Sequence, residues 1–470
     1  MKSITFTPEH QLAFAQLSGD YNPLHLDALA ARRLMYGAPV VHGIHSLLWA
    51  LDVWLEKQPD QIELRWLKVA FPKALPVGVE SQVTVTPLSD RQVRIEVTSE
   101  QSMVTSIDCE WAKSERAFAG IVEPSFPERR TPRALSLDEI ANQTGEVTLY
   151  FNPMAGARMF PNLARCVSPV TIAVLLASTR LVAEECPGLH SVFSELTLTA
   201  RDGRDSCPLH YGVTKLEKRF GLVVMNFTAP GLTGVIKAFI RPPPQRQASF
   251  AQLKPLVQRD EFSGQRALVV GGSRGLGEVT AKLLAAGGAE VKITYHQGRA
   301  EALHVVEEIV SGGGAAAMLQ VNVLNALQNE LAASLENWKP THLYYFATPF
   351  IFSGSKGVFS ASLFQKFCDY YLTGFLNVLN PLKGLGLRKV FHPSSVAVDE
   401  LPADMSEYAA AKMAAEMLCQ SLEKNRKAGL TIYKPRLPRL GTDQTATFLP
   451  VKNADPAPVM LEHLRAFRVM

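Results

Sequence analysis

The spacing of hydrophobic positions divides the first part of the chain into one main helix and a run of strands. Apolar residues from 40 to about 55 extend over a helical length with polar punctuation. Four segments follow in which apolar and polar residues alternate, and this period of two is typical of antiparallel strands with one buried face. They cover residues 64–71, 82–86, 92–97 and 103–111. A helix lying on an antiparallel sheet is therefore expected over residues 1–118, with a shorter helix at 27–36.

The same order of elements returns after a loop rich in proline and charge at 123–132. An apolar helical stretch covers residues 170–183, and strand-like segments follow it at 194–199, 209–216, 222–227 and 235–240. We therefore expect a second helix-on-sheet unit over residues 133–242. Its polar residues Asp202, Asp205 and His210 are interpreted as a turn and a strand edge rather than as a separate site.

A third region begins after the proline run at 242–244. Proline runs stay extended and stiff, so residues 243–262 are expected to form a linker. Beyond it, an apolar strand at 266–270 leads through a glycine-rich turn into a helix, and a second strand follows at 290–295. Residues 263–470 are expected to form an α/β domain. The predicted fold class is multidomain, with two α+β units followed by one α/β domain.

Composition narrows the class of protein. The 470 residues are 47% hydrophobic and 20% charged, a balance typical of globular domains. A net charge of +4 is too small to indicate nucleic-acid binding, although it suits anionic substrates. The chain has no apolar run long enough to span a membrane, no signal-peptide pattern at its N-terminus, and no C-x-x-C pair among its six cysteines. We expect a cytoplasmic protein with reduced thiols and no membrane, nucleic-acid or metal partner.

An acid and a base lie close together in the segment S-G-D-Y-N-P-L-H at residues 18–25. Gly19 and Asn22-Pro23 are turn formers, so the segment should fold back and bring Asp20 and His25 to one spot. A carboxylate beside an imidazole can exchange protons with a substrate near neutral pH. The helix predicted to follow would present free backbone N–H groups at its first turn, which suit a developing oxyanion. Proton removal next to a carbonyl needs this combination.

This segment resembles the S-G-D-x-N-P-x-H signature of (R)-specific enoyl hydratases and MaoC-type dehydratases, which have the hotdog fold, and every signature position is filled. The resemblance implies that Asp20 and His25 are the catalytic pair, adding or removing water across the 2,3 bond of an acyl thioester. It also implies that the amide of Gly43 lies near the thioester carbonyl. The alternative interpretation is an Asx turn that happens to contain a histidine.

Hotdog units of this family pair edge to edge, and two copies in one chain can form such a pair. The stretch at 133–242 lacks the signature. The resemblance therefore implies a double hotdog, and we expect that its second copy has lost the chemistry and forms a wall of the acyl tunnel.

A glycine-rich turn at residues 271–277 directly follows the strand at 266–270. Glycines there let the backbone turn tightly and approach a pyrophosphate, whose charge the start of the next helix favours. The spacing G-x-x-x-G-x-G resembles the short-chain dehydrogenase/reductase family, which has a Rossmann fold. The candidate cofactor-binding residues are Gly271, Ser273, Arg274, Gly275, Leu276 and Gly277, together with Tyr408 and Lys412.

A second group of residues supports that resemblance. Tyr408 lies thirteen positions after Ser395, and Lys412 lies four positions after Tyr408. Because positions i and i+4 share one face of a helix, the Lys412 ammonium should lower the pKa of the Tyr408 phenol. By the family resemblance, Ser395 binds the substrate carbonyl and Tyr408 exchanges its proton.

The choice of cofactor can be argued from charge. The second strand of this domain ends in Thr294-Tyr295-His296-Gln297, without the acidic residue that binds an unphosphorylated ribose. Arg274 stands where a guanidinium could meet a 2′-phosphate, so NADPH is expected rather than NADH. The alternative interpretation of Arg274 is a surface arginine.

The domain departs from the family pattern at four places. None of these departures affects Ser395, Tyr408 or Lys412. The departures are Tyr345-Phe346-Ala347-Thr348 after the fourth strand, Tyr371 where an Asn usually serves a proton relay, Asn322 near the adenine, and Pro435-Arg436 in place of Pro-Gly.

The two motifs name consecutive steps at one carbon. We therefore expect a bifunctional NADPH-dependent 3-oxoacyl-thioester reductase and 3-hydroxyacyl-thioester dehydratase of fatty-acid or polyketide-like synthesis. Its substrate would be carried on acyl carrier protein or coenzyme A, and the protein would form a homo-oligomer such as a dimer. Two alternatives stay open. One is the degradative direction, hydration followed by oxidation, and the other is a hotdog dehydratase joined to a non-catalytic nucleotide-binding domain.

Overall fold

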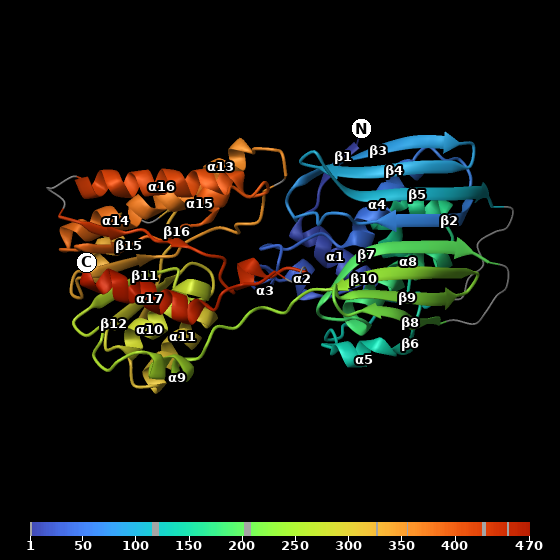
Figure 1. The fold of residues 1–470 in the computed structure, drawn as a ribbon. Helices are drawn as coiled ribbons and strands as arrows, with labels where there is room; N and C mark the ends of the chain where they lie inside the picture. Colours follow the sequence, from blue (N-terminus) through green and yellow to red (C-terminus); the bar gives the residue numbers. More distant parts are fainter. Residues whose placement is uncertain are drawn as a thin grey trace. The chain divides into compact units, whose positions relative to one another are not determined.

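The structure is a computed structural model that describes residues 2–114, 122–201, 208–325, 328–354, 356–424, 429–448 and 451–470. The chain divides into two compact units (Figure 1). The first consists of Met1–Pro243 with Thr447–Pro450, and the second of Pro244–Ala446 with Val451–Met470. Both regions predicted to be helix-on-sheet units belong to the first unit.

Within the described residues, the first unit is built on a ten-stranded antiparallel sheet with the order β1-β3-β4-β5-β2-β7-β10-β9-β8-β6. Its first half comprises β1 (Lys2–Thr5), β2 (Ile62–Ala70), β3 (Glu80–Ser89), β4 (Gln92–Ser99) and β5 (Ser102–Lys113). The second half comprises β6 (Thr144–Val147), β7 (Ser191–Ala200), β8 (Leu209–Glu217), β9 (Leu222–Ala229) and β10 (Leu232–Ile240). The halves join edge to edge where β2 pairs with β7, from Trp66 opposite Thr199 to Ala70 opposite Glu195.

A long helix covers each half of the sheet. These helices are α4 (Gly43–Leu55) and α8 (Pro169–Arg180), and α8 continues into a π-helical turn, η1 (Leu181–Glu185). We call β1–β5 with α4 the first hotdog and β6–β10 with α8 the second hotdog. This double hotdog confirms the fold predicted for the first part of the chain.

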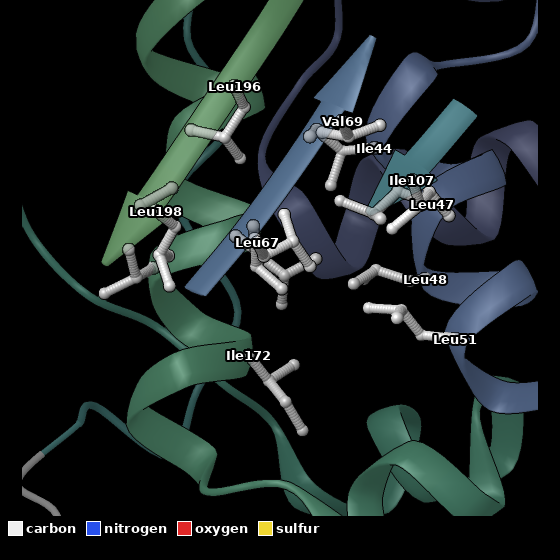
Figure 2. Close-up of a cluster of buried hydrophobic side chains, with 14 of the residues drawn as sticks. Ile44, Leu47, Leu48, Leu51, Leu67, Val69, Ile107, Ile172, Leu196 and Leu198 are labelled. Carbon is white, nitrogen blue, oxygen red and sulfur yellow. The ribbon is translucent and has the colours of Figure 1, made fainter. Parts of the chain in front are cut away.

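The apolar face of α4 is buried against the junction of the two half-sheets. Figure 2 shows the labelled side chains of this core. They are Ile44, Leu47, Leu48 and Leu51 of α4, Leu67 and Val69 of β2, Ile107 of β5, Ile172 of α8, and Leu196 and Leu198 of β7. Each such side chain contributes roughly 1.5–3 kcal/mol when it is fully removed from water. The two hotdogs therefore share one core.

Short helices shape the loop in front of α4. They are α1 (Pro8–Ser18), α2 (Pro23–Leu26) and α3 (Ala28–Ala31), so the helix predicted at 27–36 is shorter than expected. β1 and α1 were not predicted from the sequence. Gly19 ends α1 in the left-handed conformation, at φ +80, which glycine adopts without strain. That turn directs the chain into residues 19–25, which we call the Asp20 loop.

The second hotdog carries its own short helices before α8, namely α5 (Leu137–Ala141), α6 (Pro153–Met159) and α7 (Pro161–Cys166). Of the residues interpreted as a polar turn, His210 lies on β8 and its ring nitrogen is 3.8 Å from a carboxylate oxygen of Glu146. Asp202 and Asp205 lie outside the described residues.

The second unit contains a parallel sheet, with six strands in the described part of the chain and the order β13-β12-β11-β14-β15-β17. The strands are β11 (Arg266–Val270), β12 (Glu290–Tyr295), β13 (Ala315–Gln320), β14 (His342–Tyr345), β15 (Lys389–Phe391) and β17 (Thr431–Tyr433). This is the doubly wound order of a Rossmann fold, and it confirms the predicted α/β class. The order reverses between β11 and β14, and ligands of such sheets bind beyond the carboxyl ends of the strands at that point.

Helices connect and cover these parallel strands. They include α10 (Gly275–Ala286), α11 (Arg299–Ser311), α12 (Gln328–Leu335), α13 (Ala361–Cys368), α14 (Phe375–Gly384), α15 (Ala397–Glu400), α16 (Ser406–Lys424) and α17 (Pro456–Val469). Among the residues that the structure describes, none of the helices has the length and apolar character that crossing a membrane would require.

The segment at 243–262, expected to be a linker, is largely packed into the second unit. It forms α9 (Phe250–Leu253) and a 3-10 turn, and Phe250, Leu253 and Phe262 are buried. The N–H of Phe250 donates to Glu308 Oε1 at 2.5 Å, and Glu308 pairs with the buried Lys282 at 2.6 Å. The apolar residues that follow the proline run therefore act as part of the domain core rather than as a spacer.

Candidate active sites

Asp20 is the buried carboxylate of the first candidate site. Its side chain is 1% exposed. Oδ1 accepts the N–H of Asn22 at 3.1 Å, and Oδ2 accepts the hydroxyl of Thr179 at 2.7 Å. Asn22 in turn accepts the N–H of Leu24 at 3.1 Å and so begins α2, the helix that carries His25. The turn predicted from Asn22-Pro23 is thus what places the histidine.

His25 faces Asp20, as the sequence predicted. A carboxylate oxygen of Asp20 and a ring nitrogen of His25 lie within 4.8 Å of each other. His25 Nδ1 is 2.7 Å from the carbonyl oxygen of Val40. Because a carbonyl oxygen only accepts, Nδ1 carries the proton and Nε2 is left with a lone pair. The histidine is therefore oriented to accept a proton or a hydrogen bond at Nε2.

His42 packs against His25 in this site, and no role was predicted for it. The fully buried ring stacks on His25 with 3.9 Å between the ring centroids. Its Nδ1 lies 2.8 Å from Gln11 Oε1, and its Nε2 lies 3.1 Å from the backbone carbonyl oxygen of Asp20. The position of His42-Gly43 directly before an apolar helix was the available signal.

The Asp20, His25 and His42 side chains together have the residue types of a metal site, because their ligand atoms lie within 4.8 Å of one another. However, both ring nitrogens of His42 face carbonyl oxygens. Metal binding would require His42 to give up one of these contacts. We therefore interpret the cluster as a hydrogen-bonded frame around Asp20.

Burial dominates the electrostatics of the site. It raises the pKa of Asp20, against the opposing effects of the His25 charge and the hydrogen bonds from Thr179 and Asn22. Burial also lowers the pKa of His25, and it lowers that of His42 well below the usual range. The site therefore holds a carboxylate of increased basicity beside two neutral imidazoles.

Gly43 is the first residue of α4, and no side chain caps this helix start. The N–H groups of the first turn therefore remain available to an acceptor. A Cβ atom on Gly43 would come within 3.0 Å of the Phe71 ring, so the glycine lets Phe71 lie over the helix start. That its amide binds a thioester oxygen stays a prediction.

The second hotdog supplies further polar groups to this site, which the sequence analysis missed. Besides Thr179, they include Glu184, whose Oε1 accepts the N–H of Tyr21 at 2.7 Å. Arg241 is 2% exposed, and its Nη2 donates to the carbonyl of Leu189 at 2.6 Å. Within the described residues, its Nε and Nη1 have no hydrogen-bond partner. These residues lie far from the signature in sequence, so no local pattern pointed to them.

The second candidate site brings Ser395, Tyr408 and Lys412 together. Ser395 lies on β16 (Ser394–Ser395), which pairs with β18 (Arg436–Leu437), and Tyr408 and Lys412 lie on α16. The side chains of Ser395 and Tyr408 are hydrogen-bonded. The three residues that the sequence singled out therefore form one group.

The expected effect of Lys412 on Tyr408 is not found. Burial raises the pKa of Tyr408 to about 12, and the opposing influence is the hydrogen bond with Ser395. Lys412 Nζ donates to the carbonyl of Pro393 at 2.9 Å and lies 3.9 Å from the centre of the Tyr371 ring, but 5.9 Å from that of Tyr408. Burial also lowers the pKa of Lys412 to about 7. The ammonium is directed at other groups, so desolvation of the phenol prevails.

Two of the departures from the family pattern contact each other. The hydroxyl of Tyr371 lies 2.6 Å from Thr348 Oγ1, and Tyr371 belongs to a π-helical turn, η3 (Asp369–Gly374). A third departure, Arg436, donates twice to Glu416 of α16, at 2.8 and 2.7 Å. The pairing of Arg436 with Glu416 ties β18 to α16, and β18 pairs with the strand of Ser395.

The glycine-rich turn has the conformation that a phosphate needs. Gly271 and Gly275 have φ of +79 and +59, and a Cβ atom on Gly277 would lie 2.2 Å from the carbonyl oxygen of Gly271. No side chain caps the start of α10. Ser273 and Leu276 lie in the same turn, and the uncapped start of α10 suits a pyrophosphate.

Arg274 lies beside an acid in this structure. Its Nη1 is 3.9 Å from Asp443 Oδ2, and Asp443 Oδ1 also accepts the N–H of Gln245 at 2.6 Å. A phosphate bound at Arg274 would share the guanidinium with this carboxylate. At the end of β12, Tyr295, His296 and Gln297 bring no further negative charge. The residues present therefore fit a dinucleotide with a phosphorylated ribose.

Comparison with known proteins identifies two families along the chain. Residues 1–108 match the MaoC like domain, and residues 265–433 match the short chain dehydrogenase family. A 3-oxoacyl-[acyl-carrier-protein] reductase of Synechocystis sp. is 48% identical over 65 residues, which are 14% of this chain and 26% of that protein. The peroxisomal hydratase-dehydrogenase-epimerase of Saccharomyces cerevisiae is 32% identical over 68 residues, which are 14% of this chain and 8% of that protein.

These matches span about a quarter of the first relative and less than a tenth of the second. Among solved structures, a short chain dehydrogenase from Burkholderia cenocepacia in complex with NADP is 24% identical. The similarity covers 44% of this chain and 91% of that one, with a TM-score of 0.39. The chain joins a MaoC-like domain in its N-terminal part to a short-chain dehydrogenase domain in its C-terminal part.

Proposed function

We propose that this protein is a bifunctional enzyme that reduces 3-oxoacyl thioesters with NADPH and then dehydrates the 3-hydroxyacyl products. The observation that carries the proposal is the pairing of buried Asp20 with partly buried His25, in one chain with the Ser395–Tyr408–Lys412 group. The Ser395–Tyr408–Lys412 group would act on the C3 oxygen. The Asp20–His25 pair would act on the C2 proton and the C3 hydroxyl. The product of one site is thus the substrate of the other. The name of the Synechocystis relative, a 3-oxoacyl-[acyl-carrier-protein] reductase, supports the reductive step.

In the dehydration, Asp20 and His25 would have distinct tasks. His25 Nε2 accepts a hydrogen bond from the 3-hydroxyl, because Nδ1 is held by Val40. Asp20 accepts the C2 proton and passes it to the departing hydroxyl, so water leaves and the carboxylate returns to its starting state. Burial makes this carboxylate more basic than it is in water. The amide of Gly43 stabilises the negative charge that develops on the thioester oxygen.

In the reduction, the start of α10 and Arg274 would hold the phosphates of NADPH. When bound, the nicotinamide supplies the hydride. Ser395 binds the substrate carbonyl oxygen, and Tyr408 gives it a proton. Since the pKa of Tyr408 is about 12, the phenol carries its proton at neutral pH. A protonated phenol suits reduction, whereas oxidation needs the phenolate. The NADP named with the Burkholderia cenocepacia structure supports the choice of cofactor.

The test is to follow both NADPH and the acyl products after the purified protein is mixed with a 3-oxoacyl thioester on acyl carrier protein or coenzyme A. Wild type should consume NADPH and give the 2-enoyl thioester, identified by mass spectrometry. Asp20→Asn should consume NADPH fully and stop at the 3-hydroxyacyl thioester. Tyr408→Phe should not consume NADPH, yet it should dehydrate a supplied (3R)-hydroxyacyl thioester. Enoyl product from Asp20→Asn, or NADPH oxidation by Tyr408→Phe, would refute the assignment.

A second candidate function is the reverse sequence, hydration followed by oxidation. The yeast relative favours it, because its name combines a hydratase with a dehydrogenase. Turnover of a 2-enoyl thioester with NADP⁺ or NAD⁺, faster than reduction of the 3-oxo compound, would establish this direction.

A third candidate is a short-chain dehydrogenase domain that only binds nucleotide. The hydrogen bond between Tyr371 and Thr348 favours it, because both residues lie at departures from the family pattern and Tyr371 stands where the relay Asn is usual. Cofactor binding by calorimetry, without hydride transfer to any 3-oxoacyl thioester, would support this reading.

A further inference from the structure

The second hotdog lacks the Asp–His signature, yet it holds three consecutive residues of the Asp20 loop. The contacts come from the end of α8 and from η1. They are Thr179 Oγ1 to Asp20 Oδ2 at 2.7 Å, the N–H of Tyr21 to Glu184 Oε1 at 2.7 Å, and Asn22 Nδ2 to the carbonyl oxygen of Ala183 at 3.3 Å. The loop is therefore bound from outside its own hotdog.

The π-helical turn makes this arrangement possible. In a regular α-helix, side chains five positions apart point about 140° away from each other. Here α8 widens at Leu181, whose carbonyl accepts the N–H of Cys186 at 2.8 Å. Thr179 and Glu184 can then both reach the same loop. Such π-helical turns occur frequently at functional sites.

Glu184 is an unusual anchor for a backbone N–H, because it is buried and the neighbouring Arg180 is directed at other groups. Its side chain is 3% exposed, and Oε2 has no hydrogen-bond partner among the described residues. The neighbouring Arg180 donates to the carbonyl of Thr148 and lies 5.0 Å from the centre of the Tyr150 ring.

The next residue along the turn shows the contrast. Glu185 is partly exposed and faces two guanidinium groups, those of Arg130 at 3.6 Å and Arg133 at 3.8 Å. Arg130 and Arg133 are thus directed at Glu185, while the largest effect of any charge on the pKa of Glu184 is that of Asp20. An ionised Glu184 would leave one carboxylate oxygen buried without a donor, at a high cost.

We propose that Glu184 is a positioning residue of the first hotdog's active site, and that it works as a neutral carboxylic acid which anchors the Tyr21 amide without adding a second negative charge beside Asp20. The inference rests on the proposed water chemistry at Asp20 and His25. It gives the second hotdog a part in the reaction beyond that of a tunnel wall.

The electrostatics agree with this geometry. Burial, and next the charge of Asp20, raise the pKa of Glu184 to about 8, while the Tyr21 N–H and Arg180 oppose the shift and Glu185 adds to it. At pH 7 the acid is therefore protonated. Above about pH 8 it ionises, and two buried carboxylates then adjoin one loop, which weakens the loop's attachment.

The experiment measures hydration of a 2-enoyl thioester between pH 6 and 9.5 by wild type, Glu184→Gln, Glu184→Ala and Glu185→Gln. Wild-type kcat should fall above about pH 8, and Glu184→Gln, which stays neutral, should lose that decline. Glu184→Ala leaves the Tyr21 N–H without its acceptor and should lower kcat at pH 7 by about tenfold, with partial recovery in Glu184→Gln. The matched control Glu185→Gln should keep wild-type kcat at pH 7 and should still show an alkaline decline, because Glu184 is unchanged.

Thermal unfolding supplies a second readout that does not depend on substrate. A carboxyl group whose pKa rises from 4.5 to about 8 on folding stabilises the folded protein at low pH. This contribution is lost as the pH increases from 4.5 to about 8. The melting temperature of Glu184→Gln relative to wild type should therefore increase from pH 5 to pH 8.

The inference is overturned if Glu184→Gln keeps the wild-type alkaline decline, or if Glu184→Ala keeps wild-type kcat at every pH. Absence of hydration by wild type overturns the proposed function instead. In that case the melting comparison still decides whether Glu184 is a neutral acid in the folded protein.

Discussion

The two hotdogs begin their central helices in opposite ways. Before α4, His42 makes no side-chain cap and Gly43 follows it, so the first-turn N–H groups are available. Before α8, the hydroxyl of Ser168 accepts the N–H of Thr171 at 3.2 Å, and Pro169 has no N–H at the first helical position. One helix start is open to a ligand oxygen and the other is closed by the chain itself. The second hotdog, which lacks the S-G-D-x-N-P-x-H signature, thus has a side-chain cap where the first hotdog has none.

The loops in front of these helices differ in the same sense. The first carries the Asp20–His25 pair. At the corresponding place in the second hotdog, the N–H groups of Asn162 and Leu163 donate to Asp52 Oδ1 of α4, at 2.8 and 2.9 Å. The start of α7 in the second hotdog therefore binds α4, the central helix of the first hotdog. The sequence analysis gave Asn162 no role, and the structure assigns it this packing contact.

The largest expected effect on the hydration rate comes from replacing Asp20, the acid of the first hotdog. Asp20→Asn keeps the size of the side chain but removes its basicity, so kcat for hydration should fall by about 10²–10⁴-fold. Little activity should remain, because the second hotdog has no Asp–His pair to replace it. Hydration assays with stopped time points would measure this, and retention of most activity would mean that the chemistry lies elsewhere.

A smaller effect is expected at Thr179, the contact between the two hotdogs at Asp20. Thr179→Val keeps the shape but removes the hydroxyl that Asp20 accepts, and this should lower kcat for hydration by about tenfold. Thr179→Ser keeps the hydroxyl and should recover most of the rate. Equal rates for the valine and serine variants would show that the hydrogen bond does not matter to the reaction.

The closed helix start should affect stability alone. Ser168→Ala removes the cap of α8 and should lower the free energy of unfolding by about 1 kcal/mol. Denaturant titration measures the loss, while kcat for hydration at pH 7 should match wild type. A strong loss of kcat without loss of stability would contradict the purely structural role of this cap.

The smallest effect is expected for Arg241→Met, which removes a buried cation near the pair. Burial is the main cause of the lowered pKa of His25, and the Arg241 charge makes a minor contribution in the same direction. Without that charge, the pKa of His25 should rise. Because His25 acts in its neutral form, the acid limb of the kcat/KM profile for hydration should move to higher pH, by less than about one unit. A move to lower pH would exclude this electrostatic role.

Local signals in the sequence predicted much of this molecule. The signature at 18–25 and the group Ser395, Tyr408 and Lys412 depend on short spacings, which the chain itself preserves when it folds. The strands at 266–270 and 290–295 were predicted at the observed bounds, because they are short apolar runs between turns or charged residues. Short spacings and short apolar runs can be read from the sequence without knowledge of distant contacts.

The rest depends on contacts between distant residues. Thr179 and Glu184 lie 159 and 163 positions from the residues they bind in the Asp20 loop. No local pattern in the sequence predicts such partners. The prediction that Lys412 lowers the pKa of Tyr408 was wrong for a related reason. The position of the Lys412 ammonium depends on its contacts with Pro393 and Tyr371.

The presence of two hotdogs in one polypeptide also sets the ratio of the Asp20–His25 pair to the glycine-rich turn. Two identical hotdogs related by a two-fold axis would present two equal clefts, whereas this chain contains a single S-G-D-x-N-P-x-H string. The Asp20–His25 pair and the glycine-rich turn therefore occur once each in this chain. Their ratio is set by translation, and subunit exchange or unequal expression leaves it unchanged.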